Sequence, residues 1–252
     1  MTERAIAIEA ALAAGSILAD HPDGPSQVDQ KSSMVDLVTE VDSACEDAVR
    51  AVLGRHTPDI PILGEEGGGP WNARTRWVVD PLDGTTNFVH GFPFYCVSVA
   101  LEVDGELTVG VVHDPIRDRT WSATRGSGAI RHDGLHAGRD DHRPLRVSVE
   151  DRLDRALVAT GFAYDRRERA DFYLARVAAV MKVARGIRRA GAAALDLVML
   201  AEGALDAYWE YNLKWWDVAA GAVILREAGG LIDQLGGGPL DPRRPDPLAS
   251  NG

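Results

Sequence analysis

The chain has 252 residues, of which 45% are hydrophobic and 26% are charged, so it can bury a core of its own and is not disordered, collagen-like or coiled-coil. Lysine and arginine number 27 against 38 aspartate and glutamate residues, which leaves a net charge of −11. This balance disfavours general binding of nucleic acid or of anionic membranes, and an anionic substrate would need local cations such as metal ions.

The N-terminal segment is predicted to be a helix, because apolar residues recur at helical spacing from Ala5 to Ile17. A secretory signal is less favoured, since Glu3 and Glu9 lie in this segment and no basic region precedes it. No apolar run approaches the roughly 20 residues of a membrane span. Cys45 and Cys96 are too few for a disulfide framework, which favours a reducing, cytoplasmic compartment.

The next two segments differ sharply in pattern. Residues 21–33 are polar, contain two prolines and predict an exposed loop. Apolar residues then fall at helical spacing from Val41 to Val52. Thr39 is the expected N-cap of this second helix, with Asp42 three residues later in the manner of a capping box.

From residue 61 to about 130 the pattern predicts strands. An apolar run at 77–79 leads into Asp80, and Pro81 is expected to end that strand. Two further pairs of apolar runs are separated by short turn segments, which indicates hairpins. The paired runs are 95–103 with 107–112, and 121–123 with 128–130.

The second half alternates strands and helices after a charged stretch at 131–144, which we interpret as a loop and as the boundary between two lobes, 1–144 and 145–252, of a single domain. Strands are expected at 156–160, 205–209 and 231–233, and helices at 171–184, 192–202 and 216–228. The proline-rich tail at 239–247 receives no regular structure. The fold class is therefore mixed, with an antiparallel-rich first half.

The most informative motif is Asp80-Pro-Leu-Asp-Gly-Thr-Thr-Asn-Phe88. Asp80 and Asp83 follow a strand closely enough to converge on one hard cation, together with the carbonyl of Leu82. Gly84 lets the backbone approach an anion, so that its N–H and that of Thr85 can bind a phosphate. An ordinary Asx turn with a helix cap is an equally good interpretation of the motif alone.

Two other acidic segments have ordinary explanations when taken singly. Glu65 lies in Gly64-Glu-Glu-Gly-Gly-Gly69, which by itself favours a solvated, flexible loop. Asp217 opens the helix that begins Trp216-Asp-Val-Ala-Ala-Gly221, where it would serve as an N-cap.

Taken together, the acidic segments favour a metal site. Four carboxylates (Glu65, Asp80, Asp83 and Asp217) would carry a formal charge of −4, and two Mg²⁺ ions would neutralise it. Oxygen-only ligands favour Mg²⁺ over zinc. His90, His113 and His136 show no zinc-binding spacing and are interpreted as ordinary core or surface residues. Neither a nucleophile elbow, a P-loop nor a dinucleotide-binding fingerprint is present.

These motifs resemble the two signatures of the inositol monophosphatase family of Mg²⁺-dependent, lithium-sensitive phosphatases, at 80–88 and 216–221, with the Gly64-Glu65-Glu66 element upstream as in the family. The resemblance extends from Lys31 to about Asp233. It implies a layered α/β/α/β/α sandwich of the sugar-phosphatase type, an α+β fold, and a homodimer.

The resemblance also implies roles for individual residues. Metal binding, by two or three Mg²⁺ ions, falls to Glu65, Asp80, the Leu82 carbonyl, Asp83 and Asp217. Gly84 and Thr85 bind the phosphate through their N–H groups. Glu65, Thr85 and Asp83 form the catalytic set, in which the Thr85 hydroxyl and Glu65 orient the attacking water for direct, in-line hydrolysis.

Substrate and accessory residues follow from the same resemblance. Contacts to the substrate fall to Asp83, Ala193, Glu210 and Asp217, beside a segment containing Arg188. A third metal and a mobile loop would involve Lys31, Thr39 and Asp42, although a plain helix cap explains Thr39 and Asp42 equally well.

The expected substrate is inositol 1-phosphate or a similar small polyol phosphate, because Thr86 and Glu210 look more like the inositol enzymes. Histidinol phosphate, fructose 1,6-bisphosphate and phosphoadenosine phosphate are the alternatives within the family. A different class is a regulatory protein that binds RNA or a transcription factor, since arginines concentrate at 166–189. A solvated face and an anion-steering rim explain these arginines better, so a nucleic-acid partner is not expected.

Overall fold

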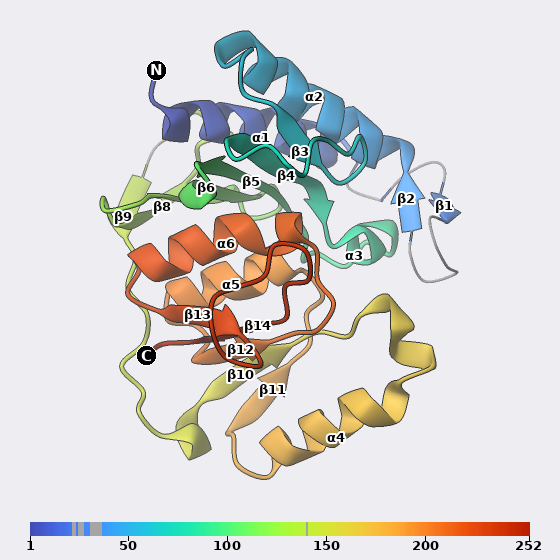
Figure 1. Ribbon diagram of the computed structural model, residues 1–252, viewed down its shortest axis with the longest axis vertical. Coiled ribbons are helices and arrows are strands. Elements are labelled where there is room, and N and C mark those ends of the chain that lie inside the picture. The colour runs from blue at the N-terminus through green and yellow to red at the C-terminus, as the bar shows by residue number, and fades with distance from the viewer. Residues whose placement is uncertain (22–23, 25–27, 31–36, 140) are drawn as a thin grey trace.

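Helices and sheets alternate in five layers (Figure 1). The computed structural model describes residues 1–21, 24, 28–30, 37–139 and 141–252. Helices α1 (Glu3–Ala19) and α2 (Glu40–His56) cover the outer face of a seven-stranded sheet. Helices α5 (Ala193–Ala201) and α6 (Trp215–Glu227) lie between this sheet and a five-stranded one, whose far side carries α4 (Ala170–Met181). The predicted α/β/α/β/α sandwich is confirmed.

The two sheets differ in strand direction. The first contains, in spatial and chain order, β3 (Ile62–Gly64), β4 (Arg76–Asp83), β5 (Cys96–Val103), β6 (Glu106–Asp114), β7 (Arg119–Thr124), β8 (Ala129–Asp133) and β9 (Asp141–Pro144). Only its β3–β4 pair is parallel. The second has the order β11 (Gly186–Arg188), β10 (Leu157–Thr160), β12 (Ala207–Trp209), β14 (Pro247–Ser250) and β13 (Leu231–Gln234). Its parallel pairs all involve β10.

Smaller elements complete the chain. Strands β1 (Val28–Gln30) and β2 (Leu37–Thr39) form a two-stranded antiparallel sheet, and α3 (Thr85–Val89) is a short helix after β4. Within the described residues, no helix combines the length and the apolar character that crossing a membrane requires. Both cysteines are buried free thiols, as expected.

Apolar side chains fill the spaces between the layers. Small residues such as Ala7, Ala10 and Ala14 let α1 lie close to α2 and to the first sheet. A second cluster packs α5 and α6 between the sheets and includes Trp121 from the first half and Tyr208 from the second. Because this cluster draws on both sides of residue 144, we propose that the chain is one domain.

Periodicity predicted the helices and most strands well, including the capping box in which Thr39 and Asp42 exchange bonds at the start of α2. One predicted strand end was wrong. Strand β4 does not end before Pro81 but continues to Asp83, with an irregular register against β5 between Asp80 and Asp83. Such an irregularity accommodates a residue without an N–H.

Segments predicted as irregular also contain strands. The polar segment 21–33 includes β1, and the charged stretch 131–144 includes the end of β8 and all of β9. The proline-rich tail ends in β14, which inserts between β12 and β13. Strand β9 is an exposed, charged edge strand, and β14 is specified by its two neighbours rather than by local pattern, so neither carried an apolar signal.

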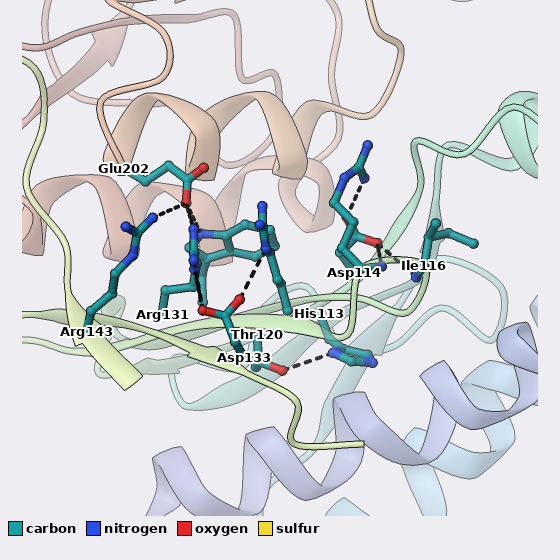
Figure 2. Close-up of polar contacts among 11 residues, drawn as sticks. His113, Asp114, Ile116, Thr120, Arg131, Asp133, Arg143 and Glu202 are labelled. Carbon is teal, nitrogen blue, oxygen red and sulfur yellow. Dashed lines mark hydrogen bonds and ion pairs between the residues drawn. The ribbon is translucent and has the colours of Figure 1, made fainter. Parts of the chain in front are cut away.

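Glu202, at the C-terminal end of α5, ties the edge of the first sheet to the middle helical layer (Figure 2). Its carboxylate accepts hydrogen bonds from Arg131 of β8 at 3.1 Å and from the Trp121 indole at 3.2 Å. Arg143 of β9 lies 3.8 Å from the same oxygen. This shared ion pair explains why a charged stretch forms strands at this edge.

Gly15 marks the closest contact between α1 and the first sheet. A Cβ atom at this position would lie 2.4 Å from Cδ2 of His113, whose fully buried ring is fixed by a 2.9 Å bond to the Thr120 hydroxyl (Figure 2). We therefore expect Gly15→Ala to lower the free energy of unfolding by about 1–3 kcal/mol through overpacking.

The control is Gly54→Ala in α2, where an added Cβ would meet no atom within 4 Å. This variant should be neutral or gain roughly 0.4–1 kcal/mol. Urea denaturation of the three proteins measures the difference, and equal stabilities for the two variants would contradict the close contact.

Candidate active site

A cavity of about 490 Å³ opens where β3 and β4 end and α6 begins, between residues of the two halves of the chain. Six carboxylates line it, together with cationic and aromatic side chains. The carboxylates are those of Glu65, Asp80, Asp83, Asp165, Glu210 and Asp217. The cavity thus brings together the acidic motifs that lie far apart in the sequence.

Strand β4 places Asp80 and Asp83 at the floor of the cavity, where they are only 2% and 9% exposed. The Leu82 N–H donates to Asp80 Oδ1 at 3.0 Å, so the Asx-turn interpretation is correct as local structure. Asp83 Oδ2 accepts from the Ala194 N–H at 2.7 Å, at the start of α5. The first bond fixes Asp80 locally within β4, and the second ties Asp83 to the middle helical layer.

Gly84 and Thr85 form the tight turn after β4. Gly84 has φ +98°, and a Cβ there would lie 3.0 Å from the Phe94 carbonyl oxygen, which is why glycine is needed. The Thr85 hydroxyl lies 3.1 Å from both the Leu82 carbonyl oxygen and Asp42 Oδ1. Asp42 is therefore both a helix-capping residue and a partner of the predicted catalytic threonine.

Glu65 follows β3, and its N–H donates to the Val79 carbonyl at 3.1 Å, which continues the parallel pairing with β4. The residues after it form a partly exposed loop, as the glycines suggested, but the loop is tethered by hydrogen bonds. The N–H groups of Glu66 and Gly67 both donate to the buried carboxylate of Glu46 at 2.8 Å. Gly67 allows this close tether to α2, since a Cβ there would lie 2.6 Å from Glu46 Oε1.

Asp217 lies in the first turn of α6, where its Oδ2 accepts from the Lys214 N–H at 2.7 Å. Asp217 is thus not the N-cap, which is Lys214, but the third helical residue, whose carboxylate caps the Lys214 N–H; the same side chain also faces the other acids. Burial and neighbouring carboxylates, that of Glu65 foremost, raise the pKa of Asp217 well above its ordinary value. The same two causes raise the pKa of Asp80.

The pKa of Asp83 results from several opposing effects. Burial raises its pKa to about 7, against the lowering effect of the hydrogen bond from Ala194, and the charge of Glu210 adds to the increase. Buried carboxylates that repel one another need a cation to remain ionised at neutral pH. The electrostatics of the cavity floor therefore suit a multivalent cation.

The donor set also fits magnesium. Every acidic group on the floor offers hard oxygen ligands, and no histidine or cysteine is among the described residues that line the cavity. In the described part of the chain, no three His, Cys, Asp or Glu side chains stand in a finished coordination geometry. Asp80, Asp83 and Asp217 each accept the backbone hydrogen bond given above.

Glu210 follows β12, lines the same cavity and is 8% exposed. Its Oε2 accepts from the Tyr208 hydroxyl at 2.7 Å. Burial raises the pKa of Glu210, while Tyr208, Arg189 and Arg166 oppose the increase. Gly161 makes room for this carboxylate, since a Cβ there would lie 2.0 Å from it.

The remaining predicted residues divide into two groups. Ala193 lines the cavity as expected, and Thr39 and Asp42 lie beside Thr85 through the capping box. Lys31 lies outside the described residues. Arg188 does not line the cavity; its neighbour Arg189 does, because adjacent residues at a strand end point to opposite sides.

Sequence reasoning missed several residues of the rim. Arg166, Lys214 and Trp216 line the cavity together with Arg189. Arg166 was noted only as part of a charged segment, and Trp216 only as the residue before Asp217. Their proximity depends on how β10, β12 and α6 converge, which no local pattern reveals.

Comparison with known proteins gives the same picture. A family model described as "Inositol monophosphatase family" matches residues 2–252. The chain belongs to the inositol monophosphatase family. An inositol-1-monophosphatase of Synechocystis is 41% identical over 249 residues, covering 98% of this chain and 84% of that protein. A Xylella fastidiosa protein named Nus factor SuhB is 44% identical over 229 residues, covering 90% and 80%.

A solved structure shares the family fold at high similarity. The extragenic suppressor protein suhB of Bartonella henselae has a TM-score of 0.88 at 38% identity, covering 98% of this chain and 92% of that one. As a member of the inositol monophosphatase family, this protein is a phosphatase that acts on phosphoric monoesters.

Proposed function

We propose that this protein is a Mg²⁺-dependent phosphatase that hydrolyses inositol 1-phosphate, or a similar small polyol phosphate, in the cytoplasm. The observation that carries the proposal is the meeting of Glu65, Asp80, Asp83 and Asp217 in one cavity, beside the N–H groups of Gly84 and Thr85. The cation-demanding floor and the adjacent backbone donors together match a phosphate ester held next to metal ions.

Bound magnesium would supply charge neutralisation at the phosphoryl oxygens and would lower the pKa of the attacking water. Glu65, Asp80, the Leu82 carbonyl, Asp83 and Asp217 would hold two ions, with Thr39 and Asp42 near a weaker third. Gly84 and Thr85 would donate their N–H groups to the phosphate. Thr85 and Glu65 would orient the water, and Asp42 keeps the Thr85 hydroxyl in place through the 3.1 Å bond.

The polyol would lie toward Glu210. Its buried carboxylate can accept hydrogen bonds from two hydroxyl groups of an inositol ring, while Ala193 leaves space beside it. Arg166 and Arg189 at the rim would attract the phosphate dianion into an otherwise acidic molecule. Because Glu210 would bind ring hydroxyls while the arginines attract the phosphate, inositol 1-phosphate is favoured over esters that lack a ring of hydroxyls.

A substrate panel tests this specificity. We expect Mg²⁺-dependent phosphate release to be fastest on inositol 1-phosphate, among a set with histidinol phosphate, fructose 1,6-bisphosphate and phosphoadenosine phosphate. Glu210→Gln should lower kcat/KM for inositol 1-phosphate by roughly 10- to 100-fold but leave p-nitrophenyl phosphate within about threefold, since a buried polar contact is lost.

The matched control is Glu168→Gln, because Glu168 is an exposed glutamate outside the cavity. Preference for another ester would retain the metal mechanism but reject the polyol assignment. An equal loss on both substrates in Glu210→Gln would show that Glu210 does not set specificity.

Two further properties belong to the same proposal: a homodimer and inhibition by lithium, both expected from family membership. The alternative function is binding to RNA or to a transcription factor, since relatives are named Nus factor SuhB. Two arginines of the segment 166–189 are engaged within the protein, which weakens this alternative. The Cζ atoms of Arg169 and Arg176 lie 4.1 and 3.5 Å from the centroid of the Phe172 ring, so these cations pack against an aromatic side chain.

A further inference from the structure

The loop that carries Glu65 is held by a buried ion pair on α2. Glu46 lies on the inner side of this helix and is only 2% exposed. Its Oε2 accepts from the Glu66 N–H and its Oε1 from the Gly67 N–H, both at 2.8 Å. Two consecutive peptide groups directly after Glu65 are thereby fixed to one carboxylate.

Arg50, one helical turn later, completes the arrangement. Its Nε donates to Glu46 Oε1 at 2.7 Å, and one terminal nitrogen donates to the Gly68 carbonyl oxygen at 2.9 Å. The guanidinium therefore balances the buried charge of Glu46 and also binds the far end of the same loop. The pair contacts three successive residues after Glu65.

The glycines of this loop are what permit the contact. A Cβ at Gly64 or Gly67 would lie 2.5 or 2.6 Å from Glu46 Oε1. Gly69 has φ +154°, and a Cβ there would lie 2.1 Å from the Ile62 carbonyl oxygen. The loop sequence is thus fitted to the Glu46–Arg50 pair and to the end of β3.

The same helix also reaches the other side of the cavity, where Asp42 bonds to Thr85. Helix α2 therefore sets the relative position of Glu65 and Thr85, the two groups expected to orient water. We propose that Glu46 and Arg50 are positioning residues that hold Glu65 in place for binding magnesium. This inference rests on the proposed function, because it assigns Glu65 to the metal site.

The test is Arg50→Ala, with Arg55→Ala as the matched control. Arg55 lies on the same helix, but its ion pair, to Glu9 at 3.4 Å, is remote from the loop. Calorimetric titration with Mg²⁺ should show roughly tenfold or greater loss of affinity in Arg50→Ala and none in the control, as for other residues that orient metal ligands. The Mg²⁺ concentration for half-maximal activity should rise in parallel, while KM for the ester at saturating Mg²⁺ changes less than about twofold.

Amide hydrogen exchange gives a readout that needs no activity. Exchange at Glu66 and Gly67 should accelerate at least about tenfold in Arg50→Ala, whereas exchange in the core of α1 should change far less. The thermal stability of Arg50→Ala should fall below that of the control, because the buried carboxylate of Glu46 loses its counter-charge. If Arg50→Ala does not fold, Arg50→Lys keeps the charge but loses the fork to Gly68, and should show the same changes to a smaller degree.

The positioning role of Glu46 and Arg50 and the proposed phosphatase function can fail independently. Affinity and amide exchange equal to the Arg55→Ala control would overturn the positioning role, even with an active enzyme. Wild-type protein that binds Mg²⁺ but releases no phosphate would overturn the proposed function, while the binding and exchange data would still decide the role of Arg50.

Discussion

Asp80→Asn is expected to lower kcat/KM for Mg²⁺-dependent phosphate release at least about 1000-fold. The side chain is 2% exposed on the cavity floor, and asparagine keeps the size and the acceptor for the Leu82 N–H while removing the charge. Loss of one anionic ligand among four weakens the hold on the metal, and a loss of about 4 kcal/mol in transition-state stabilisation corresponds to this factor.

Asp217→Asn should behave in the same way, since its carboxylate faces the same group of acids. The control is Asp59→Asn, in an exposed position outside the cavity, which should retain wild-type activity. Steady-state kinetics over a range of Mg²⁺ concentrations measures the effect. Near-normal turnover in either cavity variant would reject that residue as a ligand.

The same substitution should have a favourable effect on stability, although it abolishes activity. Asp80→Asn should stabilise the metal-free protein. Burial and like charges raise the pKa of this carboxyl, so ionising it opposes folding. Removing the charge should raise the free energy of unfolding in EDTA by about 1–2 kcal/mol, a gain typical of relieving a strained site. For a chain of this size that corresponds to a rise in Tm of roughly 2–4 °C per kcal/mol.

The stability of the metal-free protein should depend on pH. A carboxyl whose folded pKa is raised, such as Asp83 at about 7, contributes stability below its unfolded pKa, and that contribution is lost as pH rises through the folded value. Metal-free wild type should therefore lose stability between about pH 4 and pH 7. The advantage of Asp80→Asn should grow as the pH rises above the ordinary range of an aspartate, because the pKa of Asp80 is raised as well.

In the presence of magnesium, wild type should be more stable than Asp80→Asn, because the ion binds the folded wild type and stabilises it by mass action. Differential scanning fluorimetry in EDTA and in Mg²⁺, at pH 5 and pH 8, measures all four conditions. A variant that is less stable than wild type in EDTA at pH 8 would contradict mutual repulsion on the cavity floor.

The sequence predicted what local pattern determines. The helices α1 and α2 followed from apolar spacing, and the capping box at Thr39 from residue type alone. The motif around Asp80 and Asp83 could be interpreted because an apolar strand leads into it and a glycine fixes the turn directly after it, although Pro81 does not end the strand. Five of the six acids that line the cavity were therefore identified before their positions were known, and Asp165 was missed.

What the sequence could not provide depends on contacts between distant segments. Strand β14 exists because β12 and β13 leave a place between them, and nothing in its four residues marks it as a strand. Glu46 is a charged residue on the buried side of α2. Its burial is explained only by the contacts that it and Arg50 make with the loop at residues 66–68. Arg189 rather than Arg188 lines the cavity because of strand orientation, which composition does not reveal.

The central claim is that the four carboxylates hold magnesium for phosphate-ester hydrolysis. The most direct measurement is phosphate release from inositol 1-phosphate by the wild-type protein, first in EDTA and then with added Mg²⁺, alongside Asp80→Asn. We expect no release in EDTA, release in wild type on adding Mg²⁺, and none from the variant under either condition. Release by wild type in EDTA, or equal release by Asp80→Asn with Mg²⁺, would contradict it.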